Sequence, residues 1–93
     1  MDNFQINDAN ALLDQAGNLY QLSQNILRVQ ESLSGCCGRI SSAWQSETVD
    51  KESYLKVLQE NLKKVETLAA AITSLGSNLT EFAQNAIATA NNG

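Results

Sequence analysis

The stretch that decides the fold, residues 9–44, reads ANALLDQAGNLYQLSQNILRVQESLSGCCGRISSAW. Apolar residues recur in it at a strict seven-residue spacing, at Leu12, Leu19, Ile26, Leu33 and Ile40. Neighbouring positions of the same stripe hold Ala9, Ala16, Leu22, Val29, Cys36, Ala43 and Trp44. Five heptads in register beside a second apolar row indicate an amphipathic helix that packs along its whole length.

A second helical pattern follows, with apolar residues three and four positions apart. Its members are Leu55, Leu58, Leu62, Val65, Leu68, Ala69, Ile72, Leu75, Leu79, Phe82, Ala83 and Ala86. This spacing again places one broad apolar stripe on a helix. The polar face carries Glu residues four positions before Lys residues, as in Glu47 and Lys51, and such pairs favour a helix.

Between the two patterns lies the short segment Trp44-Gln45-Ser46-Glu47-Thr48. Ser46 or Thr48 can cap the second helix, and Asn7 or Asp8 can cap the first. Phe4 and Ile6, just outside the first helix, can pack against it and fix the direction in which the chain enters.

A connection this short makes the helices antiparallel neighbours. We therefore predict an all-α fold, an antiparallel two-helix hairpin that forms one domain over residues 1–93. Its helices span about 8–43 and about 48–88, the turn spans about 44–47, and the C-terminal tail is expected to fray.

Two helices alone bury only part of stripes this broad, and the remaining apolar surface calls for a partner. A second hairpin, which would complete a four-helix bundle, is the simplest partner. That hairpin could be a second copy of the chain or a paralogous hairpin protein. We expect the dimer interface to follow Leu12, Leu19, Ile26, Leu33, Ile40, Leu58, Val65, Ile72 and Leu79.

The composition argues against a catalytic, metal-binding or nucleic-acid-binding function. The 93 residues include no His, the usual general base, and two adjacent Cys cannot supply a four-ligand zinc site. Six Lys and Arg residues and ten Asp and Glu residues give a net charge of −4. The chain therefore lacks the excess of basic residues that is typical of nucleic-acid-binding proteins. We expect no catalytic residues, no cofactor or metal, no nucleic acid and no small-molecule substrate.

The segment Gly35-Cys36-Cys37-Gly38 is unusual within a helical pattern, because each helical Gly costs about 0.5–1 kcal/mol relative to Ala. We expect close approach of the two helices near the turn, with the cysteines acting as small apolar residues. A disulfide across a dimer and a local break in the helix are the alternatives.

Trp44 is the single Trp of the chain, and it lies at the turn. Such a residue can plug the end of the hairpin as a core aromatic, or it can present an anchor to a partner pocket. The two roles are compatible, because one face of the indole can pack while the other is presented.

The segment Ser41-Ser42-Ala43-Trp44-Gln45-Ser46, central in a short chain between two amphipathic helices, resembles the ESAT-6-like (WXG) small proteins of type VII secretion systems. Ser46 stands where that family usually has Gly. The resemblance implies a hairpin that dimerises into a four-helix bundle and is exported by a membrane ATPase. It also implies that Trp44 and Ser46 form the turn half of a bipartite export signal.

The other half of the family signal, a C-terminal Tyr followed four residues later by Asp or Glu, is absent. The nearest candidate is Phe82, which has Ala86 at the acidic position. Either a partner supplies the missing half, or the Phe82 region serves differently.

The N-terminus is acidic and polar and lacks the apolar core of a secretory signal. By resemblance, we expect secretion without a cleaved signal peptide, after a cytoplasmic stage, with the secretion ATPase as a partner. The alternative is a cytoplasmic chaperone-like adaptor that pairs with a larger toxin carrying a Leu-x-Gly motif. A needle-type filament subunit ranks below both, because those hairpins carry Pro in the turn and this chain has no Pro.

Overall fold

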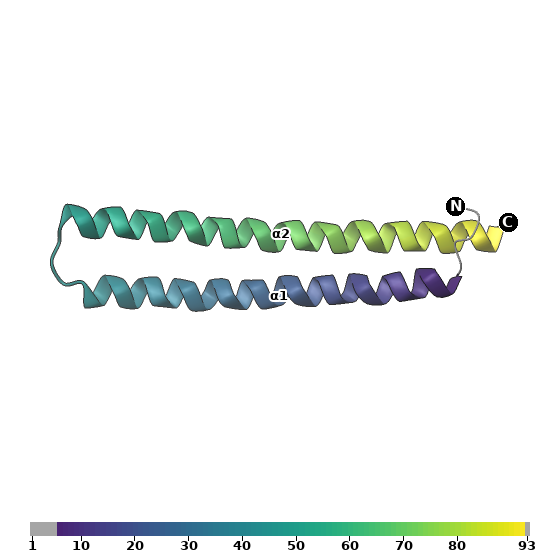
Figure 1. The fold of residues 1–93 in the computed structure, drawn as a ribbon, viewed down its shortest axis with the longest axis horizontal. Coiled ribbons are helices and arrows are strands. Elements are labelled where there is room, and N and C mark those ends of the chain that lie inside the picture. Colours follow the sequence, from purple (N-terminus) through teal and green to yellow (C-terminus); the bar gives the residue numbers. More distant parts are fainter. Residues whose placement is uncertain (1–5, 93) are drawn as a thin grey trace.

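The chain forms two long antiparallel helices in a computed structural model that describes residues 6–92, with the side chains of residues 8–91. Helix α1 spans Ile6–Ala43 and helix α2 spans Val49–Asn92. They run side by side with the turn at one end, and the start of α1 and the end of α2 at the other (Figure 1). The predicted all-α hairpin is confirmed.

Helix α1 begins earlier than expected. Its first residue is Ile6, so Asn7 and Asp8 lie within the first turn instead of capping it from outside. The carboxylate of Asp8 in this first turn complements the positive end of the helix dipole. The predicted packing of Phe4 against the helix lies outside the described residues.

The start of α2 selects one of the two predicted caps. The Thr48 Oγ1 accepts a hydrogen bond from the Lys51 backbone N–H at 3.2 Å, and the Thr48 carbonyl accepts one from the Glu52 N–H at 3.2 Å. Thr48, and not Ser46, therefore caps the helix. Asp50 and Glu52 add negative charge in the first turn.

Helix α2 continues to Asn92, beyond the end that we expected near residue 88. The expected fraying of the tail stays a prediction. The last turns of α2 are rich in Ala, the strongest helix former, at positions 83, 86, 88 and 90. This composition accounts for the longer helix.

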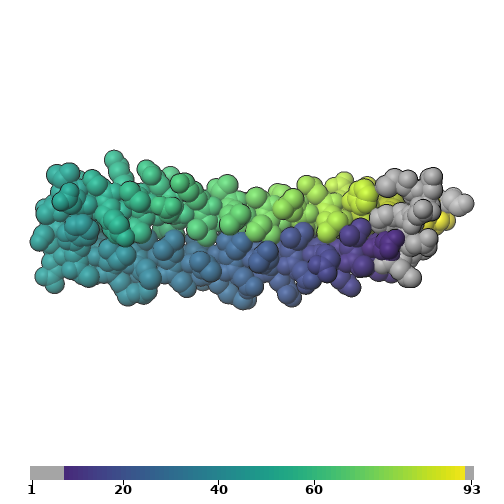
Figure 2. All heavy atoms as spheres, viewed as in Figure 1, coloured from purple at the N-terminus to yellow at the C-terminus, as the bar shows by residue number. Residues whose placement is uncertain are grey.

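The hairpin is a thin rod of 70 × 16 × 15 Å (Figure 2). Its radius of gyration is 20.7 Å, against roughly 12 Å for a compact domain of this length. The accessible surface is 6768 Å², whereas a compact monomer of this mass exposes roughly 5,300 Å². About 1,500 Å² of surface that a compact protein would bury is therefore in contact with solvent.

Candidate docking face and turn

The two helices meet along a row of mostly small side chains. We call this row the seam. Its buried members are spaced by seven residues, or by multiples of seven, on each helix: Ala9, Ala16, Ser23 and Cys37 on α1, and Leu62, Ala69, Gly76 and Ala83 on α2. A strict seven-residue contact row implies a slight left-handed supercoil of the pair.

The helices approach each other closely at Gly76. A Cβ atom added to Gly76 would lie 3.3 Å from the Ala16 carbonyl oxygen and 3.1 Å from Cε1 of the Tyr20 ring. The helices are also closer in this part of the hairpin than beside the turn (Figure 1). The small residues of the seam allow the two backbones to approach each other. At Gly76 they are so close that even the methyl group of an Ala would be crowded.

A polar cluster sits inside the seam. The Ser23 hydroxyl donates to the Ala69 carbonyl oxygen at 2.9 Å and lies 2.7 Å from the Thr73 hydroxyl. Thr73 Oγ1 also donates to the Ala69 carbonyl at 3.1 Å. Because a shift of register would leave the buried Ser23 hydroxyl without partners, this cluster fixes the register of the two helices.

The predicted interface residues lie beside the seam and not in it. All nine are half-buried: Leu12, Leu19, Ile26, Leu33, Ile40, Leu58, Val65, Ile72 and Leu79. Each lies three residues after a position of the seam row of its own helix. Three residues are about 60° short of a full helical turn, so these side chains point about 60° away from the line where the helices meet. In antiparallel helices, equal rotations from the contact line fall on the same side, so both rows share one face of the hairpin.

More exposed apolar side chains extend the same face. They lie one residue before the seam rows, and their members are Leu22, Val29, Leu68, Leu75 and Phe82. We call these five together with the nine half-buried residues the docking face. Leu75 is 57% exposed and Val29 is 59% exposed, so the docking face is an apolar surface in water along most of the rod.

The opposite flank of the seam is mixed in chemistry. It holds Thr73, Thr80 and Glu66, whose carboxylate accepts a hydrogen bond from the Gln30 side-chain amide at 3.5 Å, and it also holds Leu13, Leu27 and Tyr20, which is 38% exposed. The docking face, with five large exposed apolar side chains, is the more apolar of the two flanks.

At the turn, Trp44 packs against a residue that the sequence pattern did not single out. The Trp44 ring is half-buried, and its centroid lies 6.1 Å from that of Tyr54, with the planes inclined by 42°. The Trp44 backbone N–H donates to the Ile40 carbonyl oxygen at 2.9 Å and closes the last turn of α1. Because Tyr54 follows Trp44 by ten residues across the turn, no helical spacing connects them in the sequence.

The turn also buries a lysine. Lys51 is 6% exposed, and its ammonium donates to the Glu47 carboxylate at 2.7 Å. Glu47 itself is largely exposed, so this predicted pair lies at the edge of the protein. Ser46 adopts no positive φ, so the Ser side chain imposes no backbone strain at this position of the turn.

The Gly35–Gly38 segment shows no close approach of the helices, and this expectation was wrong. A Cβ added to Gly38 meets nothing within 4 Å, and one added to Gly35 meets only the Arg39 guanidinium. Both glycines lie on the outer side of α1, which runs through them without a break. The close approach lies instead at Gly76, which the seven-residue spacing from Ala69 and Ala83 could have revealed.

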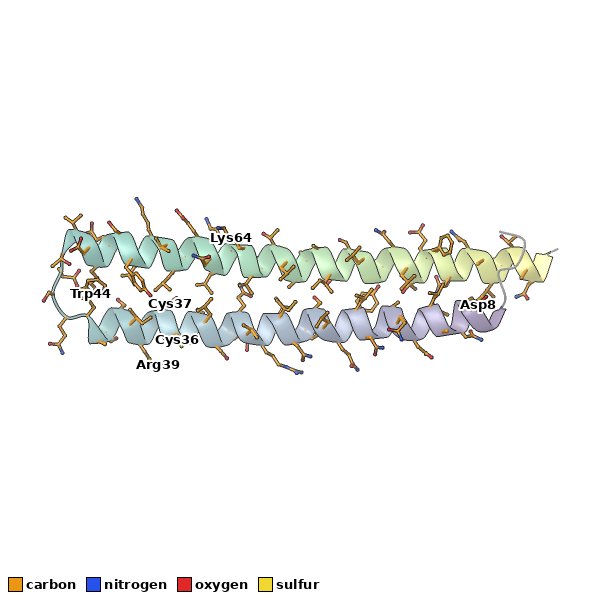
Figure 3. All side chains as sticks on the ribbon, viewed as in Figure 1. Asp8, Cys36, Cys37, Arg39, Trp44 and Lys64 are labelled. Carbon is orange, nitrogen blue, oxygen red and sulfur yellow. The ribbon has the colours of Figure 1, made fainter. Side chains whose placement is uncertain are left out.

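The two cysteines have different surroundings. Cys37 is buried in the seam, as expected of a small apolar residue, and Figure 3 shows it between the helices. Cys36 is half-buried, and its sulfur accepts a hydrogen bond from the Arg39 guanidinium at 3.1 Å. Both are free thiols within the hairpin, and an intermolecular bridge stays a prediction.

Neither a metal cluster nor a membrane span emerges within residues 6–92. No three side chains of the metal-binding types gather there, and neither helix is long and apolar enough to cross a bilayer. Comparison with family models, curated proteins and solved structures gave no match. The candidate functional surfaces are thus the docking face and the Trp44 turn.

Proposed function

We propose that the protein acts without catalysis, as a small partner or substrate of a type VII secretion system that works by helix-bundle association. The docking face carries this proposal. The largest side chain that is fully buried in the described hairpin is that of Ser23, while nine large apolar side chains are exposed, five of them on the docking face. A hairpin without a core of large side chains gains one by packing against a second hairpin.

The turn supplies the recognition element of this proposal. Trp44 is held by Tyr54 and by the end of α1, yet it keeps part of its ring accessible. A fixed, partly exposed indole is a typical anchor for a partner pocket. Recognition by the secretion ATPase or its associated proteins would use this turn, together with the Phe82 region near the C-terminus.

An export assay tests the role of Trp44. In a host with a type VII secretion system, we expect the wild-type chain in the medium and Trp44→Ala retained in the cells at normal levels. Val49→Ala is the matched control, because Val49 lies beside the turn and is 77% exposed. Helix content of purified Trp44→Ala must equal that of wild type, and normal export of this variant would contradict the role of Trp44.

The adaptor function remains the second candidate. It is favoured by the missing acidic residue four positions after Phe82, because a larger toxin could then carry the rest of the export signal. Co-expression with a helical toxin domain that has a Leu-x-Gly motif separates the two functions. A stable complex with the toxin, and export only in its presence, supports the adaptor; export of the chain alone contradicts it.

A further inference from the structure

We infer that the half of the hairpin away from the turn has a second docking surface, which binds one amphipathic helix of another protein with basic residues along its flanks. We call this half the terminal half, and the other the turn half. The surface lies on the flank of the seam opposite the docking face, so the inference goes beyond the proposed association and does not depend on it.

The surface is formed by six residues, each four positions after a seam position of its own helix. Four residues are about 40° more than one helical turn, so these side chains point to the flank opposite the docking face. We call them the terminal strip: Leu13, Tyr20 and Leu27 on α1, and Thr73, Thr80 and Ile87 on α2.

Tyr20 is the anchor of the terminal strip. A Cβ atom added to Gly76 would lie 3.1 Å from Cε1 and 3.3 Å from Cζ of the Tyr20 ring, so the ring rests in the notch that Gly76 leaves. Tyr20 is nevertheless 38% exposed. An aromatic ring that is already held in place loses little conformational entropy when a partner covers it, and such rings are typical interface anchors.

The two threonines of the terminal strip can be covered at low cost. Thr73 Oγ1 donates to the Ala69 carbonyl oxygen at 3.1 Å, and Thr80 Oγ1 donates to the Gly76 carbonyl oxygen at 2.9 Å. Both hydroxyl groups therefore already use their hydrogen within α2. A partner that covers them leaves no buried donor unsatisfied.

The terminal strip has a defined length. Leu13 and Leu27 lie roughly 21 Å apart, from 14 residues at 1.5 Å each, so a partner helix of about 21 residues covers the strip with one turn to spare at each end. Toward the turn the same two rows hold only polar residues: Ser34 and Ser41 on α1, and Glu52, Gln59 and Glu66 on α2.

The charge of the terminal half determines the chemistry of the partner. All six Lys and Arg residues lie within residues 28–66, and the rest of the chain holds four carboxylates and no cation. Asp14 directly follows Leu13, and Glu81 directly follows Thr80, so an exposed carboxylate lies outside the strip on each helix. Lys and Arg at the flanks of a partner helix are attracted by these charges, whereas Asp and Glu are repelled.

A second copy of the chain does not fit the terminal strip. In the same direction, it would bring two acidic terminal halves together. Turned end for end, it would lay Leu13, Tyr20 and Leu27 on the rows that contain Glu52 and Glu66. The partner is therefore a different chain.

The area of the terminal strip suits a single helix. A strip roughly 30 Å long and 15 Å wide offers roughly 450 Å², so the two partners together bury about 900 Å². Interfaces of this size are typical of transient complexes. The partner helix should therefore bind reversibly.

Titration with designed peptides tests the inference. The first peptide is a helix of about 21 residues with Leu on one face, Ala opposite Tyr20 and Lys at the flanking positions, and the second has Glu in place of each Lys. At low salt the wild-type chain should bind the Lys peptide at least tenfold more tightly than the Glu peptide, as measured by fluorescence anisotropy. Amide shifts in NMR spectra should concentrate in residues 13–27 and 73–87.

Two variants and one control localise the binding. Tyr20→Ala removes the anchor, and Gly17→Lys adds a cation between Leu13 and Tyr20 on the helix surface, where an added Cβ meets nothing within 4 Å. Each should weaken binding of the Lys peptide at least tenfold. Leu22→Ala, the matched control, truncates a 48% exposed side chain of the docking face and should change the affinity less than twofold. Gly17→Lys decides the test if Tyr20→Ala loses helix content, because Lys is favoured over Gly in a helix.

Equal binding of the two peptides, no binding at millimolar concentration, or an affinity unchanged by Gly17→Lys would overturn the inference. A larger loss with Leu22→Ala than with Tyr20→Ala would also overturn it, because the peptide would then bind the docking face. A lower solution mass of Gly17→Lys than of wild type would show a second copy on the strip, with the same consequence. Export of Trp44→Ala and association through the docking face, which test the proposed function, do not depend on these outcomes.

Discussion

The terminal half and the turn half of the hairpin are built differently. In the terminal half the seam consists of Ala, Ser and Gly, the backbones approach closely at Gly76, and Leu22, Leu68, Leu75 and Phe82 are left exposed. In the turn half Val29 and Val57 are also exposed, but the seam holds the larger Cys37 and Leu62, and Trp44 packs against Tyr54 at the end of the hairpin. Small contact residues bring helices together but bury little apolar area, so the terminal half depends more on a partner.

The largest expected effect comes from placing a charge on the docking face of the terminal half. Leu68→Glu removes a large apolar side chain and forces an unpaired carboxylate into the interface. We expect the free energy of dimerisation to weaken by about 3 kcal/mol or more, over 100-fold in Kd. Sedimentation equilibrium measures this change.

Gln84→Glu is the matched control for that variant. Gln84 is exposed in the same half and lies off the docking face, one residue after the seam residue Ala83. It adds the same charge, so a similar loss of dimer with Gln84→Glu would mean that net charge, and not the docking face, governs association.

The next effect tests the close approach itself. Gly76→Leu places a bulky side chain where a Cβ is already 3.3 Å from the Ala16 carbonyl oxygen. We expect the free energy of unfolding to fall by about 1–3 kcal/mol, because the helices must separate. Urea unfolding at a fixed protein concentration measures the loss, and Gly38→Leu should be without such a loss because that site is open. Equal destabilisation by both substitutions would contradict the seam.

A smaller effect is expected at the turn half. Thr48→Ala removes the oxygen that accepts the Lys51 N–H, and loss of such a cap costs about 1 kcal/mol. Thermal unfolding followed by circular dichroism should show a lower Tm with an unchanged Kd for dimerisation. Ser46→Ala is the comparison, and an equal loss from it would contradict the assignment of Thr48 as the cap.

The smallest effect is a gain. Gly38 faces open space in the interior of α1, and Ala is favoured over Gly in a helix by about 0.5–1 kcal/mol. Gly38→Ala should raise the urea midpoint, whereas Gly76→Ala should not, because its methyl group is crowded by Tyr20 and the Ala16 carbonyl. A drop in stability for Gly38→Ala would show that the outer side of α1 contacts something in the assembly.

The sequence predicted the hairpin because two long apolar stripes and a five-residue connection leave few other packings. It did not reveal which row forms the seam, since pattern reasoning gives weight to the large residues Leu and Ile, whereas the helices meet through Ala69, Gly76 and Ala83. The expected close approach at Gly35 and Gly38 failed for a different reason, because the helical phase places these glycines on the outside of α1. The Trp44–Tyr54 contact depends on the path of the turn, which spacing does not encode.

The central claim is that the docking face is covered in solution, and the mass of the purified wild-type chain tests it most directly. Light scattering across micromolar concentrations, with and without reductant, should give twice the chain mass of 10.1 kDa under both conditions. A stably helical chain with the mass of a monomer at all concentrations would contradict the claim.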